Sequence, residues 1–165
     1  MNTCRFRQTR TAEKRGKEMA SRIEIGFKKG IRDALGERIR KRIVEHLRIH
    51  VDLVKTIEVY TIDGPLAPEE LEKAARGPLS DPIIQETAIN RGLAQGFDWL
   101  IEVGFRPGVT DNVGKTAGEA VRLLTGKPVQ VYLSRQYAIS GIRDRCDLDT
   151  LTRMDAERIA SELLA

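Results

Sequence analysis

The chain has 165 residues, of which 41% are hydrophobic and 32% charged, and its formal net charge is +4. This composition is typical of a water-soluble domain, without an apolar run long enough for a membrane helix and without a secretory signal at the start. Two scattered cysteines, Cys4 and Cys146, exclude a disulfide framework or a cysteine metal site and favour the cytoplasm.

Residues 1–20 carry many charges and almost no periodic apolar residue, which predicts a disordered basic tail. A basic arm could touch nucleic acid or direct the chain to an organelle. We favour the alternative that Met19 marks the start and that the residues before it are an upstream extension.

The elements predicted after the tail alternate between strands and helices. In chain order they are a strand at Arg22–Phe27, a helix whose apolar stripe is Leu35, Ile39, Ile43 and Leu47, a strand at Val54–Ile62, a helix at Pro68–Arg76 and a closing strand at Pro82–Ile89. The same order then begins again with a strand at Trp99–Phe105, a helix with the stripe Val113, Ala117, Val121 and Leu124, a strand at Val129–Ile139 and a helix at Met154–Leu164.

The second series is an internal repeat of the first. The segment IEIGFKKGIRDALG, from Ile23, returns as IEVGFRPGVTDNVG, from Ile101, with seven of fourteen residues identical and an offset of 101 − 23 = 78. A second block, from Val54, returns from Val131 at an offset of 77 and shares Val, Tyr, Ile and Gly. Two units without a third predict a pseudo-twofold pair, not a solenoid.

The predicted fold class is α+β, with two tandem sandwich units whose helices cover one face of an antiparallel sheet. We place the first unit at residues 21–96 and the second at residues 97–165. The second unit has no counterpart of the closing strand Pro82–Ile89, so we expect a free sheet edge there. Such an edge predicts a longer native chain, strand donation by a partner, or self-association.

Both units share the pattern Gly-x-x-Asp-x-x-Gly where a strand leads into a helix. Its residues are Gly30, Asp33 and Gly36 in the first unit and Gly108, Asp111 and Gly114 in the second. The pattern predicts a turn with positive φ at the first glycine, a helix cap at the aspartate and a close backbone approach at the second glycine. In the second unit it continues into Lys115-Thr116, like a phosphate-binding loop, but one residue too many separates the glycines and the first unit lacks the lysine.

Other polar residues give weaker signals. His46 and His50 have the spacing of a metal pair on a helix, although two solvated histidines explain them better. Glu24 and Glu102 occupy equivalent strands and could form a catalytic carboxylate pair, but we favour a solvent-facing or salt-bridged role. The basic run Arg38–Arg42 reads as a solvated helix face. Arg135 and Tyr137 are candidates for a partner interface, since Arg and Tyr are common binding anchors, and a packing role is equally compatible.

The order of these elements, with the segments VKTIEVYTID and SDPIIQE, resembles the PurS family, the small subunit of phosphoribosylformylglycinamidine synthase in de novo purine biosynthesis. The segment DWLIEVGFRPGVTDNVGKTA resembles the amino-terminal region of fused synthases. The resemblance covers residues 21 to 165 and implies a noncatalytic ligase component. It would bridge a PurQ-type glutaminase and a PurL-type synthetase and help ammonia pass between them. It implies no catalytic residue, metal or cofactor in this chain, with ATP and Mg²⁺ belonging to the synthetase.

Two other classes of function stay open. Paired α+β units could form a small-molecule regulatory module with a ligand at their interface. A nucleic-acid-binding protein would use the basic tail and Arg38–Arg42. The chain has only one Trp, three Tyr and four Phe, and no aromatic platform interleaves with the basic residues, so this class is disfavoured.

Overall fold

A computed structural model describes residues 2–8, 20–106, 108–141 and 151–164 of the chain. Its centre is a six-stranded antiparallel sheet with the strand order β1-β5-β6-β3-β2-β4. The strands are β1 (Asn2–Gln8), β2 (Ala20–Phe27), β3 (Val51–Asp63), β4 (Gln85–Ile89), β5 (Trp99–Phe105) and β6 (Gln130–Gly141). The long strands β3 and β6 pair along nearly their whole length, from Val51 opposite Gly141 to Asp63 opposite Gln130.

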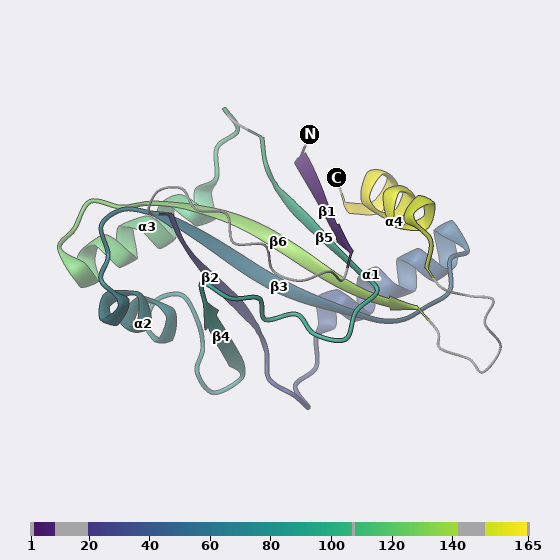
Figure 1. Cartoon of the computed structure of the whole chain (residues 1–165), viewed down its shortest axis with the longest axis horizontal. Helices are drawn as coiled ribbons and strands as arrows, with labels where there is room; N and C mark the ends of the chain where they lie inside the picture. Colours follow the sequence, from purple (N-terminus) through teal and green to yellow (C-terminus); the bar gives the residue numbers. More distant parts are fainter. Residues whose placement is uncertain (1, 9–19, 107, 142–150, 165) are drawn as a thin grey trace.

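The helices cover one face of this sheet in two pairs, at opposite ends of the molecule (Figure 1). They are α1 (Ala34–Arg42), which continues into a π turn η1 (Ile43–Leu47), α2 (Pro68–Arg76), α3 (Asn112–Thr125) and α4 (Arg153–Ile159), which continues into η2 (Ala160–Leu164). The architecture is therefore α+β with one antiparallel sheet, as the alternating pattern predicts.

Each pair of helices covers its own hydrophobic core. The first core joins α1 and α4 to β5 and to the facing ends of β3 and β6, with Ile43, Ile101, Ile139 and Ile159 fully buried. The second joins α2 and α3 to β2 and the other ends of β3 and β6. Each core thus contains one helix from residues 21–96 and one from residues 97–165.

The predicted elements are present, with two differences in detail. The helix α3 buries Gly114, Ala117, Gly118 and Val121, whereas Val113 and Leu124 of the predicted stripe are exposed. Glycine has no apolar side chain, so a pattern of apolar residues does not reveal a helix face on which glycines are buried. The closing strand begins at Gln85 and not at Pro82, because Pro82 to Ile84 form a turn before it.

The first strand corrects the expectation of disorder at residues 1–20. Residues Asn2–Gln8 form β1, which pairs with β5 from Asn2 opposite Phe105 to Gln8 opposite Trp99. Residues 9–19 of the predicted tail lie outside the described part. The strand β1 occupies beside β5 the position that β4 occupies beside β2, so the predicted free edge of β5 is paired within the chain. Polar and apolar residues alternate in Thr3-Cys4-Arg5-Phe6-Arg7, which is the pattern of a strand. The prediction of disorder gave more weight to the many charges of residues 1–20 than to this alternation.

The sheet face away from the helices is partly covered by the segment between β4 and β5. The backbone N–H of Leu93 donates to Glu24, 2.8 Å away, and the Leu93 side chain lies over Gly26, where an added Cβ would come within 2.9 Å of it. The start of this segment is fixed by Asn90, whose N–H donates to Arg22 O and whose Oδ1 accepts from Arg22 N–H. As a result Glu24 is buried although it faces away from both cores.

The second glycine of each joint is required because a helix backbone there lies directly against a strand. A Cβ on Gly36 would collide with Val54 O, and one on Gly114 would lie 2.6 Å from Val131 O. A Cβ on Gly118, in the same helix as Gly114, would meet only ordinary contacts with Val131, the nearest at 3.6 Å.

We therefore predict that Gly36→Ala and Gly114→Ala each lower the free energy of unfolding by about 1–3 kcal/mol, the usual cost of overpacking. Gly118→Ala is the matched control and should be neutral or stabilising by up to about 1 kcal/mol, because alanine favours a helix. Urea unfolding followed by circular dichroism measures all three. Equal effects of Gly114→Ala and Gly118→Ala would contradict the close approach.

Candidate functional site

The two strand-to-helix joints have the same geometry. Gly30 and Gly108 have φ values of 87° and 88°, in the left-handed region that favours glycine. Asp33 Oδ1 caps α1 by accepting from Gly36 N–H at 2.7 Å, and Asp111 Oδ1 caps α3 by accepting from Gly114 N–H at 2.7 Å. The predicted roles of the first glycine and of the aspartate are confirmed in both units.

Each aspartate also makes a second bond that the sequence does not reveal. Asp33 Oδ2 accepts from the backbone N–H of Thr56 on β3, and Asp111 Oδ2 accepts from the backbone N–H of Leu133 on β6, both at 2.6 Å. One carboxylate thus ties the start of a helix to a neighbouring strand. Thr56 and Leu133 are equivalent positions, 77 residues apart, so the repeat extends to these hydrogen bonds.

The same bonds argue against a phosphate cradle at Gly108–Thr116. The carboxylate of Asp111 already occupies the N–H of Gly114, where a phosphate would need it, and Lys115 N–H donates to Asp111 O within the helix. A second anion at this point would be repelled by Asp111. The hydroxyl of Thr116 donates to Asn112 O, so it is also engaged.

A polar network lies at the centre of the sheet face opposite the helices. Arg22 donates to Glu24 Oε1 at 2.9 Å and to both carboxylate oxygens of Glu102, the shorter bond being 2.7 Å. Gln136 Nε2 bridges the same two glutamates, at 3.4 Å from Glu24 and 3.2 Å from Glu102, and Ser134 Oγ donates to Glu102 at 2.7 Å. The equivalent glutamates of the two units are therefore joined in one network.

The network stabilises the charged form of Glu102 and does not activate it as a base. Burial of Glu102 raises its pKa, but the bonds from Arg22 and Ser134, with the positive charge of Arg22, outweigh this and hold the pKa below its ordinary value of 4.5. A general base needs a pKa near the working pH. The salt-bridged role expected for Glu24 and Glu102 is thus the one that the geometry supports. Sequence reasoning missed Arg22 and Gln136. The signal for Arg22 is that it precedes Glu24 by two residues, which places both on one face of the strand, and Gln136 has no such signal.

One atom of the network lacks a protein partner. Gln136 is 4% exposed, and its Oε1 accepts no hydrogen bond among the residues that the structure describes. Its Nε2 must face the two carboxylates, so Oε1 is turned away from them. A buried acceptor of this kind is usually satisfied by an ordered water.

The candidate interface residues Arg135 and Tyr137 lie on the other face, toward the helices. The side chain of Arg135 is 35% exposed and pairs with Glu58 at 2.8 Å, between the two helix pairs. Tyr137 is buried in the first core. Of the two, only Arg135 can reach a partner without rearrangement of the core.

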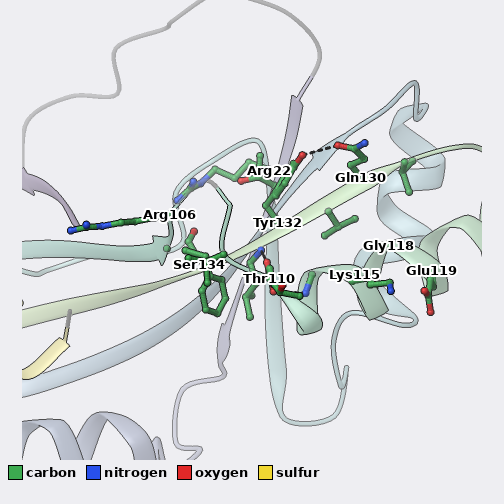
Figure 2. A pocket seen from close by; sticks show the side chains of 18 of the residues that line it. Arg22, Arg106, Thr110, Lys115, Gly118, Glu119, Gln130, Tyr132 and Ser134 are labelled. Atoms are coloured by element: carbon green, nitrogen blue, oxygen red, sulfur yellow. Dashed lines mark hydrogen bonds between the residues drawn. The ribbon is translucent and has the colours of Figure 1, made fainter. Parts of the chain in front are cut away.

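A cavity of about 1130 Å³ lies beside the second joint (Figure 2). It lies between α3, the end of β5 with the loop after it, and the strand β6 from Gln130 to Ser134. Gly108, Thr110, Asp111, Gly114 and Lys115 line it, so the loop that resembles a phosphate cradle borders a cavity although its helix cap is already filled.

The remaining candidates gain no support as sites. His46 and His50 are both exposed, and no group of three potential metal ligands occurs in the described part of the chain. The basic residues of Arg38–Arg42 are exposed, as a solvated helix face requires. None of the described helices combines the length and the apolarity needed to cross a bilayer.

Comparison with protein-family models finds no family that matches the chain, and comparison with curated proteins and with solved structures likewise finds no match.

We predict that Asp33→Ala and Asp111→Ala each destabilise the protein by about 1–3 kcal/mol, since each removes a helix cap and leaves a strand N–H without its acceptor. Thr152→Ala is the control, because Thr152 caps α4 by accepting from Asp155 N–H without a bond to a strand. It should cost only the cap, about 0.5–2 kcal/mol. Urea unfolding compares the three variants, and a silent substitution at either aspartate would contradict the double role.

Acid should weaken the central network in a predictable direction. Because the pKa of Glu102 is lowered in the folded state, its contribution is complete above the ordinary value of 4.5 and is lost as the pH falls through the folded-state pKa. Glu102→Gln should therefore lower the free energy of unfolding by about 1.5–3 kcal/mol at pH 7, and the deficit should shrink below pH 4.5.

The measurement is urea unfolding of wild type and variant across this pH range. Glu86→Gln removes an exposed carboxylate from β4 and controls for the loss of one charge. A deficit of Glu102→Gln that stays constant down to acid pH would contradict the assignment.

Proposed function

We propose that the chain is a tandem, PurS-like pseudo-twofold pair that serves as the noncatalytic bridging part of phosphoribosylformylglycinamidine synthase. In this role it joins a PurQ-type glutaminase to a PurL-type synthetase and helps ammonia pass from one to the other. The chain itself contributes no reacting group, and ATP and Mg²⁺ are bound by the synthetase.

The observation that carries this proposal is the way the two units share their cores. Helix α1 packs with α4, and α2 packs with α3, so each core takes one helix from each unit. Neither unit buries its helices by itself, which favours a single rigid body over two independent ligand-binding domains. A rigid body with one helix pair at each end suits a protein that holds two other proteins in place.

The pairing of β3 with β6 supports the pseudo-twofold relation. Glu58 lies opposite Arg135, and these two positions are equivalent at the offset of 77, since 135 − 58 = 77. A twofold axis through the sheet would therefore pass between them. Two identical units would place like charges together at this point, whereas the tandem chain places a 2.8 Å ion pair there. The sequence difference between the units thus favours pairing within one chain.

The test is reconstitution with purified synthetase and glutaminase from the same source. We expect the chain to co-sediment with both and to raise glutamine-dependent amidine formation severalfold, with ammonia-dependent formation unchanged. The chain alone should turn over neither ATP nor glutamine. Absence of a complex, or equal gains with glutamine and with free ammonia, would overturn the bridging role.

A matched pair of variants tests where the partner docks. Arg135→Ala removes the half-exposed arginine between the helix pairs, and Arg158→Ala removes an exposed arginine of α4 that pairs with Glu162. If the surface between the two helix pairs is the interface, only Arg135→Ala weakens the complex. Circular dichroism verifies that both variants remain folded.

A second candidate is the small-molecule regulatory module. The cavity beside the second joint is the specific observation that favours it, because its volume of about 1130 Å³ is more than enough to hold a small molecule. The two functions are compatible in one protein.

A further inference from the structure

The cavity beside the second joint has two chemically distinct sides. One side is basic and belongs to α3, which contributes Lys115, labelled in Figure 2, and Arg122, two turns further along the helix. Among the residues that the structure describes, neither of them has an ion-pair partner. Both cations are therefore available to an anion that enters the cavity.

Two aromatic residues and a valine of the lining are incompletely covered: Phe105, Val109 and Tyr132 are 45%, 50% and 52% exposed. Because side chains alternate along a strand, Phe105 lies on the sheet face that carries α3, whereas Tyr132 lies on the opposite face with Ser134. Tyr132 is oriented by a hydrogen bond from its hydroxyl to Gln130 Oε1 at 2.7 Å, drawn as a dashed line in Figure 2. Half-exposed aromatic rings at a cavity favour a ligand with a flat ring, which can stack on them.

The acidic residues of the lining do not cancel this basic character. Asp111 is engaged by two backbone N–H groups, and Glu102 is paired with Arg22. Glu119 remains, on the α3 face between Lys115 and Arg122. The cations thus outnumber the acids that are not already bound.

The first unit provides an internal comparison. At the positions equivalent to Thr110 and Lys115 it has Arg32 and Glu37, which form an ion pair of 2.6 Å that joins the loop to the helix. Glutamate in the first turn also suits the positive end of a helix, whereas Lys115 does not. The second unit therefore gives up a stabilising pair at the place where its loop and helix border the cavity.

We propose that this cavity binds a small organic anion that carries a flat ring, with the anionic group at Lys115 and Arg122 and the ring against Phe105. This goes beyond the bridging role and does not depend on it. Loss of the site would leave complex formation intact, and failure of the bridging role would leave the site intact.

The test is isothermal titration of the full chain with four probes. AMP combines a ring with an anion, adenosine has the ring alone, ribose 5-phosphate has the anion without the ring, and inorganic phosphate is the anion by itself. We expect AMP to bind at least tenfold more tightly than each of the other three. No detectable binding of AMP at millimolar concentration, or equal binding of AMP and inorganic phosphate, would overturn the proposal.

The location is tested by moving the ion pair of the first unit into the second. The double variant Thr110→Arg/Lys115→Glu should weaken AMP binding at least tenfold, because it removes one cation and places a loop–helix pair at the cavity wall. The reverse exchange, Arg32→Thr/Glu37→Lys, is the matched control and should leave AMP binding within twofold of wild type.

Arg122→Ala is an independent variant on the exposed face of α3 and should also weaken binding of AMP. Circular dichroism and thermal unfolding verify that each variant is folded. Unchanged AMP binding by the Thr110→Arg/Lys115→Glu variant or by Arg122→Ala would place the ligand elsewhere and overturn the assignment.

Discussion

The antiparallel pairing of β3 with β6 is the constraint on which the rest of the structure depends. It joins the two halves of the chain along nearly the whole length of two long strands. Because the strands run in opposite directions, the start of β3 lies beside the end of β6. Helix α1, which precedes β3, therefore meets α4, which follows β6, and α2 meets α3 at the other end. Slipping β6 by one residue against β3 would turn every buried side chain of β6 to the other face. Both cores would be lost together.

The joints hold the helices to this central pair. Each depends on an aspartate that bonds a helix N–H and a strand N–H, and on a glycine without which the helix could not approach the strand. The helices therefore cannot shift along the sheet without breaking a charged hydrogen bond. The cavity beside α3 exists in this rigid setting, since β5 last pairs with β6 at Gly104 opposite Ser134 and α3 borders the strand beyond that point.

The central polar network shows why burial cannot be read from local pattern alone. Glu24 alternates with apolar neighbours and so appears to face solvent, as in an ordinary half-buried strand. It is buried because a segment about 70 residues later in the chain covers that face and donates the N–H of Leu93. Arg22 and Gln136 then come from different strands and donate hydrogen bonds to both glutamates. The sequence shows the residue types, but it does not show that residues 22, 102 and 136 lie close together. Their proximity depends on the order of the strands in the folded sheet.

Local sequence determined the elements and the chemistry of the joints. Apolar spacing located β2, β3, β5, β6 and all four helices, and the repeated Gly-x-x-Asp-x-x-Gly specified the left-handed turns and the caps, because both depend on residues only three positions apart. Only the tertiary structure decided which helix packs with which, that Asp33 and Asp111 also bond a strand, and that β1 closes the edge of β5. These contacts join residues between 22 and about 120 positions apart, and no local propensity encodes which of several chemically suitable partners the folded sheet will place within reach.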